Sequence, residues 1–166
     1  DHALRLAVSL GNEAIASMLL ENGARPHDSP AGAECDRKYS TPLLIAAAIK
    51  GRADMIKAIL ERSPSLVNSV AESTGNTALL YAVKHHQPGA VDALIEAGAG
   101  LNARDCDGVT ALHAAARSPD YLPILRMILT RGADVDAIDR LSTTLLFVAV
   151  KNGNKVGINE LVSAGA

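Results

Sequence analysis

A short motif recurs along this chain at a period near 33 residues, and this repetition restricts the fold more than any other feature. Its clearest copy opens with Thr110-Ala-Leu-His113 and closes with Arg131-Gly-Ala-Asp134. A unit of this length cannot bury its apolar face alone, so several units must stack into an array. We therefore expect function to lie on a surface that continues across units rather than in a pocket.

The five copies share one order of parts. The opening segments are His2–Arg5, Thr41–Leu44, Thr77–Leu80, Thr110–His113 and Thr144–Phe147. A helix with paired small residues follows, at Ala7-Val8, Ala46-Ala47, Ala82-Val83, Ala115-Ala116 and Ala149-Val150. A second helix carries an apolar triplet spaced i, i+3, i+4, which places all three side chains on one helical face. These triplets are Ala16/Leu19/Leu20, Ile56/Ile59/Leu60, Val91/Leu94/Ile95, Leu125/Ile128/Leu129 and Ile158/Leu161/Val162. The copies end at Gly23, Ser63, Gly98, Gly132 and Gly165, where glycine suits the left-handed backbone that closes a helix.

These motifs resemble the ankyrin repeat over nearly the whole chain. The resemblance implies an all-α solenoid of stacked antiparallel helix pairs with short β-hairpin loops, in a single array over residues 1–166. The expected repeats are 1–23, 36–63, 72–98, 105–132 and 139–166, with an extended exposed loop at 24–40. It also implies that His113 bonds to Thr110 for structural reasons, and that Asn68 and Asn102 cap hairpins or are hydroxylated.

Composition agrees with a folded array and excludes several functions. A chain of 166 residues that is 48% hydrophobic can bury a substantial core, and no apolar run approaches membrane-spanning length. The formal net charge of −2 argues against general nucleic-acid binding. We expect a monomeric array, in which Leu94 and Ile128 contribute more stability than Leu161 in the last repeat.

Both ends of the chain lie inside repeats, so we expect the sequence to be part of a longer array or a multidomain protein. Cys35 and Cys106 stand in positions that indicate exposed, free thiols. Free thiols favour a reducing compartment, which is the cytoplasm or the nucleus.

No pattern of catalytic, metal-binding or cofactor-binding residues emerges. His85 and His86 are adjacent, and neighbouring residues on a helix point about 100° apart, so they cannot easily share a metal ion. Ser17, Ser73 and Ser163 lack a nucleophile-elbow context. The helix-ending glycines lack the spacing of a phosphate-binding loop. We therefore predict a protein without enzymatic activity, metal or cofactor.

A row of cations interrupts the apolar pattern seven residues after the last three opening threonines, at Lys84, Arg117 and Lys151. In the family that the chain resembles, first helices and hairpin tips line a concave face that recruits other proteins. We predict partner-binding residues on the first helices at Ile49, Lys84, His85, Arg117, Lys151 and Asn152. We predict further ones at the hairpin tips, at Arg37, Lys38, Tyr39, Asn76, Asp107, Val109 and Arg140.

Two alternatives remain open for this row and two for the whole chain. The row either receives an acidic segment of another protein or is only a solvated helix face. Among these positions, Tyr39 is the one plausible aromatic anchor. The array acts either as a protein-interaction scaffold or as a regulatory appendage that docks onto a catalytic or channel domain of the same chain.

Overall fold

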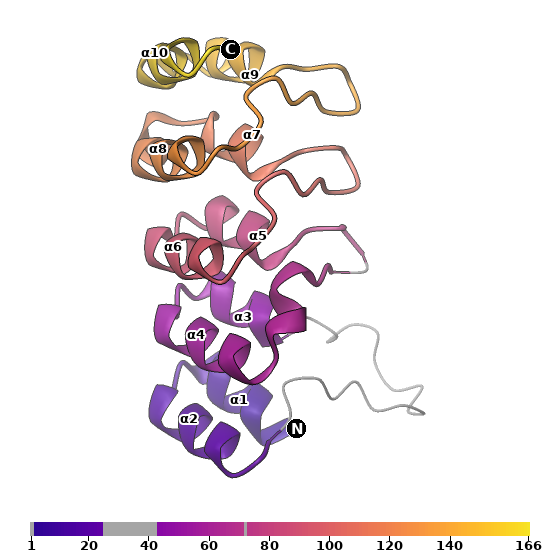
Figure 1. Cartoon of the computed structure of the whole chain (residues 1–166), viewed down its shortest axis with the longest axis vertical. Helices are drawn as coiled ribbons and strands as arrows, with labels where there is room; N and C mark the ends of the chain where they lie inside the picture. The colour runs from indigo at the N-terminus through magenta and orange to yellow at the C-terminus, as the bar shows by residue number, and fades with distance from the viewer. Residues whose placement is uncertain (1, 25–42, 72) are drawn as a thin grey trace.

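The computed structural model describes residues 2–24, 43–71 and 73–166, whose helices stack in two parallel layers (Figure 1). The first helices of the repeats are α1 (His2–Leu10), α3 (Leu43–Ile49), α5 (Ala78–Lys84), α7 (Ala111–Ala115) and α9 (Leu145–Lys151). The second helices are α2 (Glu13–Glu21), α4 (Ala53–Arg62), α6 (Pro88–Glu96), α8 (Leu122–Thr130) and α10 (Lys155–Ser163). Short 3-10 helices η2 (Pro64–Asn68) and η3 (Pro119–Tyr121) precede the third repeat and α8.

Each helix packs against its counterpart in the next repeat, such as α3 on α5 and α5 on α7 in the first layer. The loops between repeats project from one side of the stack, and the two termini lie at its opposite ends (Figure 1). Isolated antiparallel bridges join Val70 to Thr77 and Ile138 to Thr144 at the bases of two of these loops. The all-α solenoid is confirmed. The predicted loop 24–40 lies outside the described residues except for Ala24.

The opening threonines of the last three repeats are helix N-caps. Thr77, Thr110 and Thr144 have extended backbone, and each hydroxyl accepts a hydrogen bond from the backbone N–H three residues later. This bond satisfies a donor that has no partner within the helix. The repeated threonine therefore fixes where each first helix begins.

Small residues on the first helices let neighbouring repeats approach closely. Ala47, Ala82, Ala115 and Ala149 are all completely buried. A close-packed interior leaves no room for a larger side chain there without moving the helices apart. The apolar triplets of the second helices are buried or, at Leu19, Leu129 and Ile158, partly buried, except that Val162 in the last repeat is 55% exposed.

The second repeat corrects the predicted alignment by one residue. Gly51 N–H bonds to Ala48 O just as His86 N–H bonds to Val83 O. Ala47 and Ala48, not Ala46 and Ala47, therefore form its small-residue pair. The extra residue of this repeat comes before these alanines, and the shift moves Ile49 to the position that Lys84 occupies in the third repeat.

His113 is a buried structural residue, as the resemblance implied. Its Nδ1 accepts a hydrogen bond from the Thr110 backbone N–H at 3.3 Å and lies 2.9 Å from the Thr110 hydroxyl oxygen. Its Nε2 lies 3.2 Å from the Thr143 carbonyl oxygen in the next repeat. With Nδ1 as acceptor, Nε2 carries the proton and donates it to that carbonyl. His113 thus joins two successive repeats.

The titration of His113 should make the fold less stable in mild acid. Burial lowers the pKa of His113, and the hydrogen bond to Thr143 offsets this only in part. The unfolded chain therefore binds the proton more readily, and stability falls as the pH drops below about 6.5. We expect urea unfolding to show lower stability at pH 5.0 than at pH 7.5. This loss of stability between pH 7.5 and pH 5.0 should be smaller in His113→Leu. Leucine is chosen because Leu80 holds the equivalent position in the third repeat. An equal loss in both proteins would contradict this role.

Truncation of core residues should reveal how far each repeat depends on its neighbours. Leu94, Ile128 and Leu161 are all completely buried, so the expectation that Leu161 contributes less finds no support in its burial. We predict that alanine at each of these positions lowers the free energy of unfolding by about 2–5 kcal/mol. Val162→Ala is the control from the same helix, and its exposed side chain should cost less than about 1 kcal/mol. Equal losses at Val162 and Leu161, measured by urea denaturation, would contradict this account.

Candidate recognition face

The first-helix face consists of the residues that directly follow the small-residue pairs, together with the hairpin tips. On the helix side it contains Ile49, Lys84, His85, Arg117, Lys151 and Asn152. All of these are exposed except Ile49, which is partly buried. Because α5, α7 and α9 stack in one layer, residues at equivalent positions follow one another along the array (Figure 1).

Two aspartates fix the shape of the hairpin tips. Asp105 Oδ1 accepts hydrogen bonds from the backbone N–H groups of Asp107 and Val109, at 3.0 and 2.9 Å. Asp139 does the same for Leu141 and Thr143, both at 2.8 Å. The bond from the Thr143 backbone is the main reason that the pKa of Asp139 lies below its usual value. The tips are therefore ordered turns.

The tips of successive repeats are also joined by their backbones. Cys106 N–H donates to Thr74 O at 3.0 Å, and Arg140 N–H donates to Asp107 O at 2.9 Å. Among the predicted tip residues, Asp107, Val109 and Arg140 lie on this edge, whereas Arg37, Lys38 and Tyr39 lie outside the described residues.

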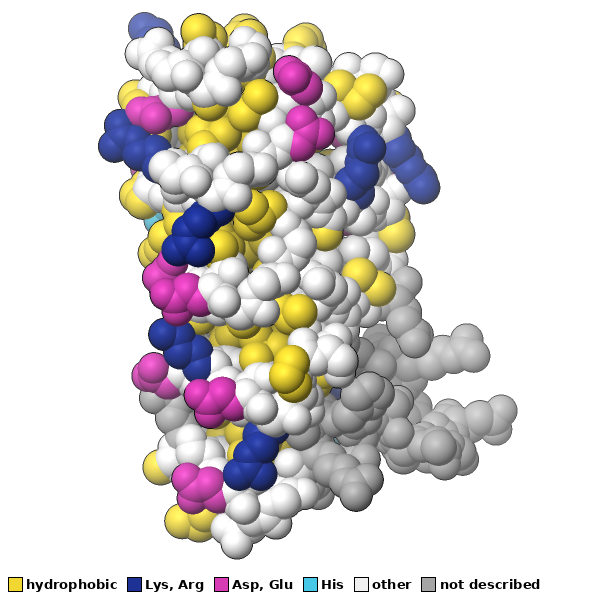
Figure 2. Space-filling view, in the orientation of Figure 1, with side chains coloured by type: hydrophobic (Ala, Val, Ile, Leu, Met, Phe, Trp, Pro, Cys, Tyr) yellow, Lys and Arg dark blue, Asp and Glu magenta, His cyan; other side chains and the backbone are white. Residues whose placement is uncertain are grey.

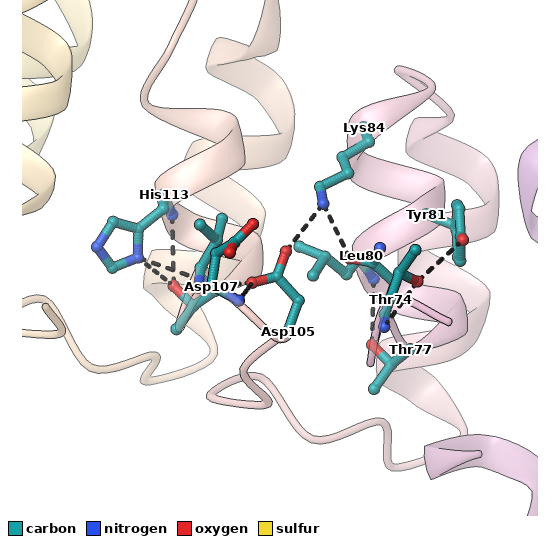
Figure 3. Close-up of polar contacts among 11 residues, drawn as sticks. Thr74, Thr77, Leu80, Tyr81, Lys84, Asp105, Asp107 and His113 are labelled. Atoms are coloured by element: carbon teal, nitrogen blue, oxygen red, sulfur yellow. Dashed lines mark hydrogen bonds and ion pairs between the residues drawn. The ribbon is translucent and has the colours of Figure 1, made fainter. Parts of the chain in front are cut away.

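Lys84 and Asn76 form a contact between repeats. Lys84 Nζ lies 2.8 Å from Asn76 Oδ1 and 3.0 Å from Asp105 Oδ2 (Figure 3). Asn76 is buried, and the Asp105 side chain is only 6% exposed. The charge of Lys84 is therefore neutralised within the array, and its ion pair connects the third repeat to the hairpin of the fourth.

Arg117 and Lys151 stand seven residues after the opening threonines of the next two repeats, as Lys84 does in the third. Lys84 and Lys151 end α5 and α9, whereas Arg117 lies in the turn after α7. Arg117 and Lys151 are both exposed, and within the described residues neither side chain makes a hydrogen bond or an ion pair. Arg140, at the tip of the last hairpin, is exposed and bonds through its backbone alone. The predicted row of three cations thus contains two that are available to a partner.

An aromatic pair on the same face was missed by the sequence analysis. The Tyr81 ring stacks on His85 with ring centroids 6.4 Å apart, and the Tyr81 hydroxyl lies 3.2 Å from Thr74 Oγ1. Tyr81 and His85 are four residues apart on one helix, the spacing that brings side chains together. The four-residue spacing could therefore have identified the pair from the sequence. Lys84, three residues after Tyr81, lies on the same side of the helix.

His86 forms the turn that follows α5. Its φ of 55° is a conformation that Gly51 and Gly153 take at the matching turns. The ring packs edge-to-face on Tyr121, with centroids 4.8 Å apart. No group of three or more metal-ligating side chains occurs among the residues that the structure describes.

Three cations on the second-helix side are paired with carboxylates of other repeats. Lys57 contacts Glu96 at 3.3 Å, Arg131 contacts Asp92 at 3.6 Å and Arg126 contacts Glu160 at 2.6 Å. The hydrogen bond from Arg126 is the main cause of the lowered pKa of Glu160. Acidic and basic side chains alternate along this side of the stack (Figure 2). These cations, unlike Arg117 and Lys151, already have partners.

Asn68 and Asn102 connect the loops of neighbouring repeats. Asn68 Oδ1 accepts from Gly100 N–H at 2.8 Å, and Asn102 Oδ1 accepts from Asp134 N–H at 2.9 Å. Both bonds reach the loop of the next repeat, 32 residues further along the chain, so the two asparagines act between repeats rather than within one hairpin. Within the described residues, no helix has the length and apolar character needed to cross a membrane.

Substitution of Lys84 should separate its structural role from that of the free cations. Lys84→Met removes the ion pair and leaves Asp105 partly buried without its cation. We expect a loss of about 1 kcal/mol, at the upper end for exposed pairs, because Asp105 is shielded from water. Arg117→Met is the matched control and should change stability by less than about 0.5 kcal/mol. Thermal and urea unfolding of both variants test this difference, and equal effects would contradict it.

Comparison with known proteins agrees with this architecture. The family described as "Ankyrin repeats (3 copies)" matches residues 4–105, 43–139 and 90–166. An ankyrin repeat domain-containing protein SAT10 from Stachybotrys chartarum is 37% identical over 105 residues, which are 61% of this chain and 5% of that protein. The ankyrin repeat and SOCS box protein 6 of Mus musculus is 36% identical over 103 residues, 61% of this chain and 25% of the relative. The human protein of the same name is 35% identical over 102 residues, which are 61% of this chain and 24% of the human protein.

The chain therefore spans a quarter or less of the length of these curated relatives. The family match covers nearly every residue and agrees with the stacked helix pairs, the threonine caps and the paired alanines. This chain belongs to the ankyrin repeat family.

Proposed function

We propose that this array is a non-enzymatic recognition module that binds an acidic segment of another protein on the first-helix face of repeats three to five. Ankyrin repeats are generally protein–protein interaction modules. The observation that supports a particular face is that, within the described residues, the side chains of Arg117 and Lys151 make no hydrogen bond or ion pair, whereas Lys57, Arg126 and Arg131 on the second-helix side are each paired with a carboxylate of another repeat.

The chemistry of the face favours a carboxylate-bearing partner. Lys151 ends α9, Arg117 lies in the turn directly after α7 of the adjacent repeat, and Arg140 adds a third cation at the neighbouring hairpin tip. A partner with complementary charge associates faster and in a defined orientation. His113 supports no catalytic alternative, because its two ring nitrogens are occupied by Thr110 and Thr143. An acidic segment elsewhere in a longer chain would meet the same surface, so the proposal covers both sources of the segment.

Charge reversal tests this face directly. A displayed library of random peptides would be selected on the purified array and then measured against the double variant Arg117→Glu/Lys151→Glu. We expect the selected peptides to be rich in Asp and Glu and to bind the variant at least about tenfold more weakly, a change of about 1.4 kcal/mol.

The matched control is Arg62→Glu/Lys155→Glu, which changes the net charge equally through exposed cations of the second helices. It should retain binding. Selection of peptides without an excess of acidic residues, or equal loss of binding in both double variants, would contradict the proposal.

A further inference from the structure

We propose, resting on the proposed function, that the acidic segment binds as a polyproline II helix. A proline or another apolar residue would lie on the Tyr81–His85 ring pair, and carboxylates three and six residues away would meet Arg117 and Lys151. The inference follows from the spacing of equivalent positions along the array and from the different chemistry that each repeat offers there.

The spacing of repeats limits the backbone conformation of the segment. Packed helices lie about 8–10 Å apart, so the C-terminal ends of α5, α7 and α9, with Arg117 in the turn directly after α7, recur at about that distance. A polyproline II helix has three residues per turn and rises about 3.1 Å per residue. Every third side chain therefore points the same way about 9 Å further on, which matches the array.

A β-strand does not match this spacing. Side chains on one face of a strand recur every second residue, about 6.6 Å apart, or every fourth, about 13 Å apart. An α-helix matches only through every seventh residue, at about 10.5 Å. A partner helix that contacts three repeats would then need about 15 residues, and isolated helices of that length are only marginally stable in water.

The third repeat selects an apolar residue rather than a third carboxylate. Lys84 is neutralised by Asp105, so a carboxylate placed beside it would meet an existing negative charge. The stacked rings of Tyr81 and His85 lie on the same side of α5, with His85 exposed. Proline-rich polyproline II segments characteristically dock on aromatic surfaces. Repeats three to five therefore present an aromatic pair, then Arg117, then Lys151.

Synthetic peptides of fixed composition test the spacing. The probe is a fluorescein-labelled peptide with the pattern Pro-x-x-Glu-x-x-Glu, where x is Ala or Ser, measured by fluorescence anisotropy at physiological salt. The reversed pattern is measured as well, because the side-chain spacing is the same in both chain directions. The first comparison peptide contains the same residues with its two glutamates two residues apart. The second is longer, and its proline and two glutamates are each seven residues apart.

We expect one of the three-spaced peptides to bind at least about tenfold more tightly than either comparison peptide. His85→Ala should weaken this binding several-fold. The control His86→Gly removes a neighbouring ring that packs on Tyr121 and should leave the binding unchanged.

The outcomes distinguish the two proposals. Equal binding of all acidic peptides overturns the polyproline II inference and leaves the proposed function standing. Tightest binding of the seven-spaced peptide also overturns it, in favour of a helical partner. If no acidic peptide binds while the peptide library yields non-acidic binders, both proposals fail.

Discussion

The rest of the structure depends on the packing of each helix pair against the next. A single repeat exposes an apolar face on both sides, so its stability comes from burying those faces against neighbours. Completely buried alanines such as Ala82 and Ala115 allow this packing to be close. The threonine caps, the His113 bridge and the Asn102 bond then fix the position of each repeat relative to the next. A continuous surface with regular spacing is the direct result.

The charged residues of the array are of two kinds, those paired between repeats and those without such a partner among the described residues. Ion pairs such as Arg126–Glu160 and Lys84–Asp105 join adjacent repeats, so their charges are satisfied inside the array. Arg117 and Lys151 have no such partners among the described residues, although both, like Lys84, stand seven residues after an opening threonine. Position in the repeat therefore does not define a binding residue. The surroundings that the next repeat supplies decide whether a cation stabilises the fold or remains available.

The sequence was sufficient to predict the fold and the helix pairs, and the recognition face stays a prediction. These features depend on local signals that recur, such as the threonine cap and the i, i+3, i+4 triplets. The errors concern contacts between repeats. The pairing of Lys84 with Asp105 joins residues 21 positions apart, which periodicity alone does not reveal. The register of Ala47 and Ala48 differs from the predicted pair Ala46 and Ala47, because the extra residue of the second repeat precedes the alanines instead of following them. The exposure of Val162 depends on what packs beside α10, a property outside the repeat itself.

The proposed recognition face consists of the first helices and hairpin tips of repeats three to five. Backbone amide chemical shifts, recorded by NMR while an acidic peptide is titrated into the array, test it residue by residue. The account predicts that the largest changes occur at His85, Arg117, Lys151 and Asn152, with little change along α6, α8 and α10. Changes concentrated on those second helices, with the first-helix face unaffected, would contradict it.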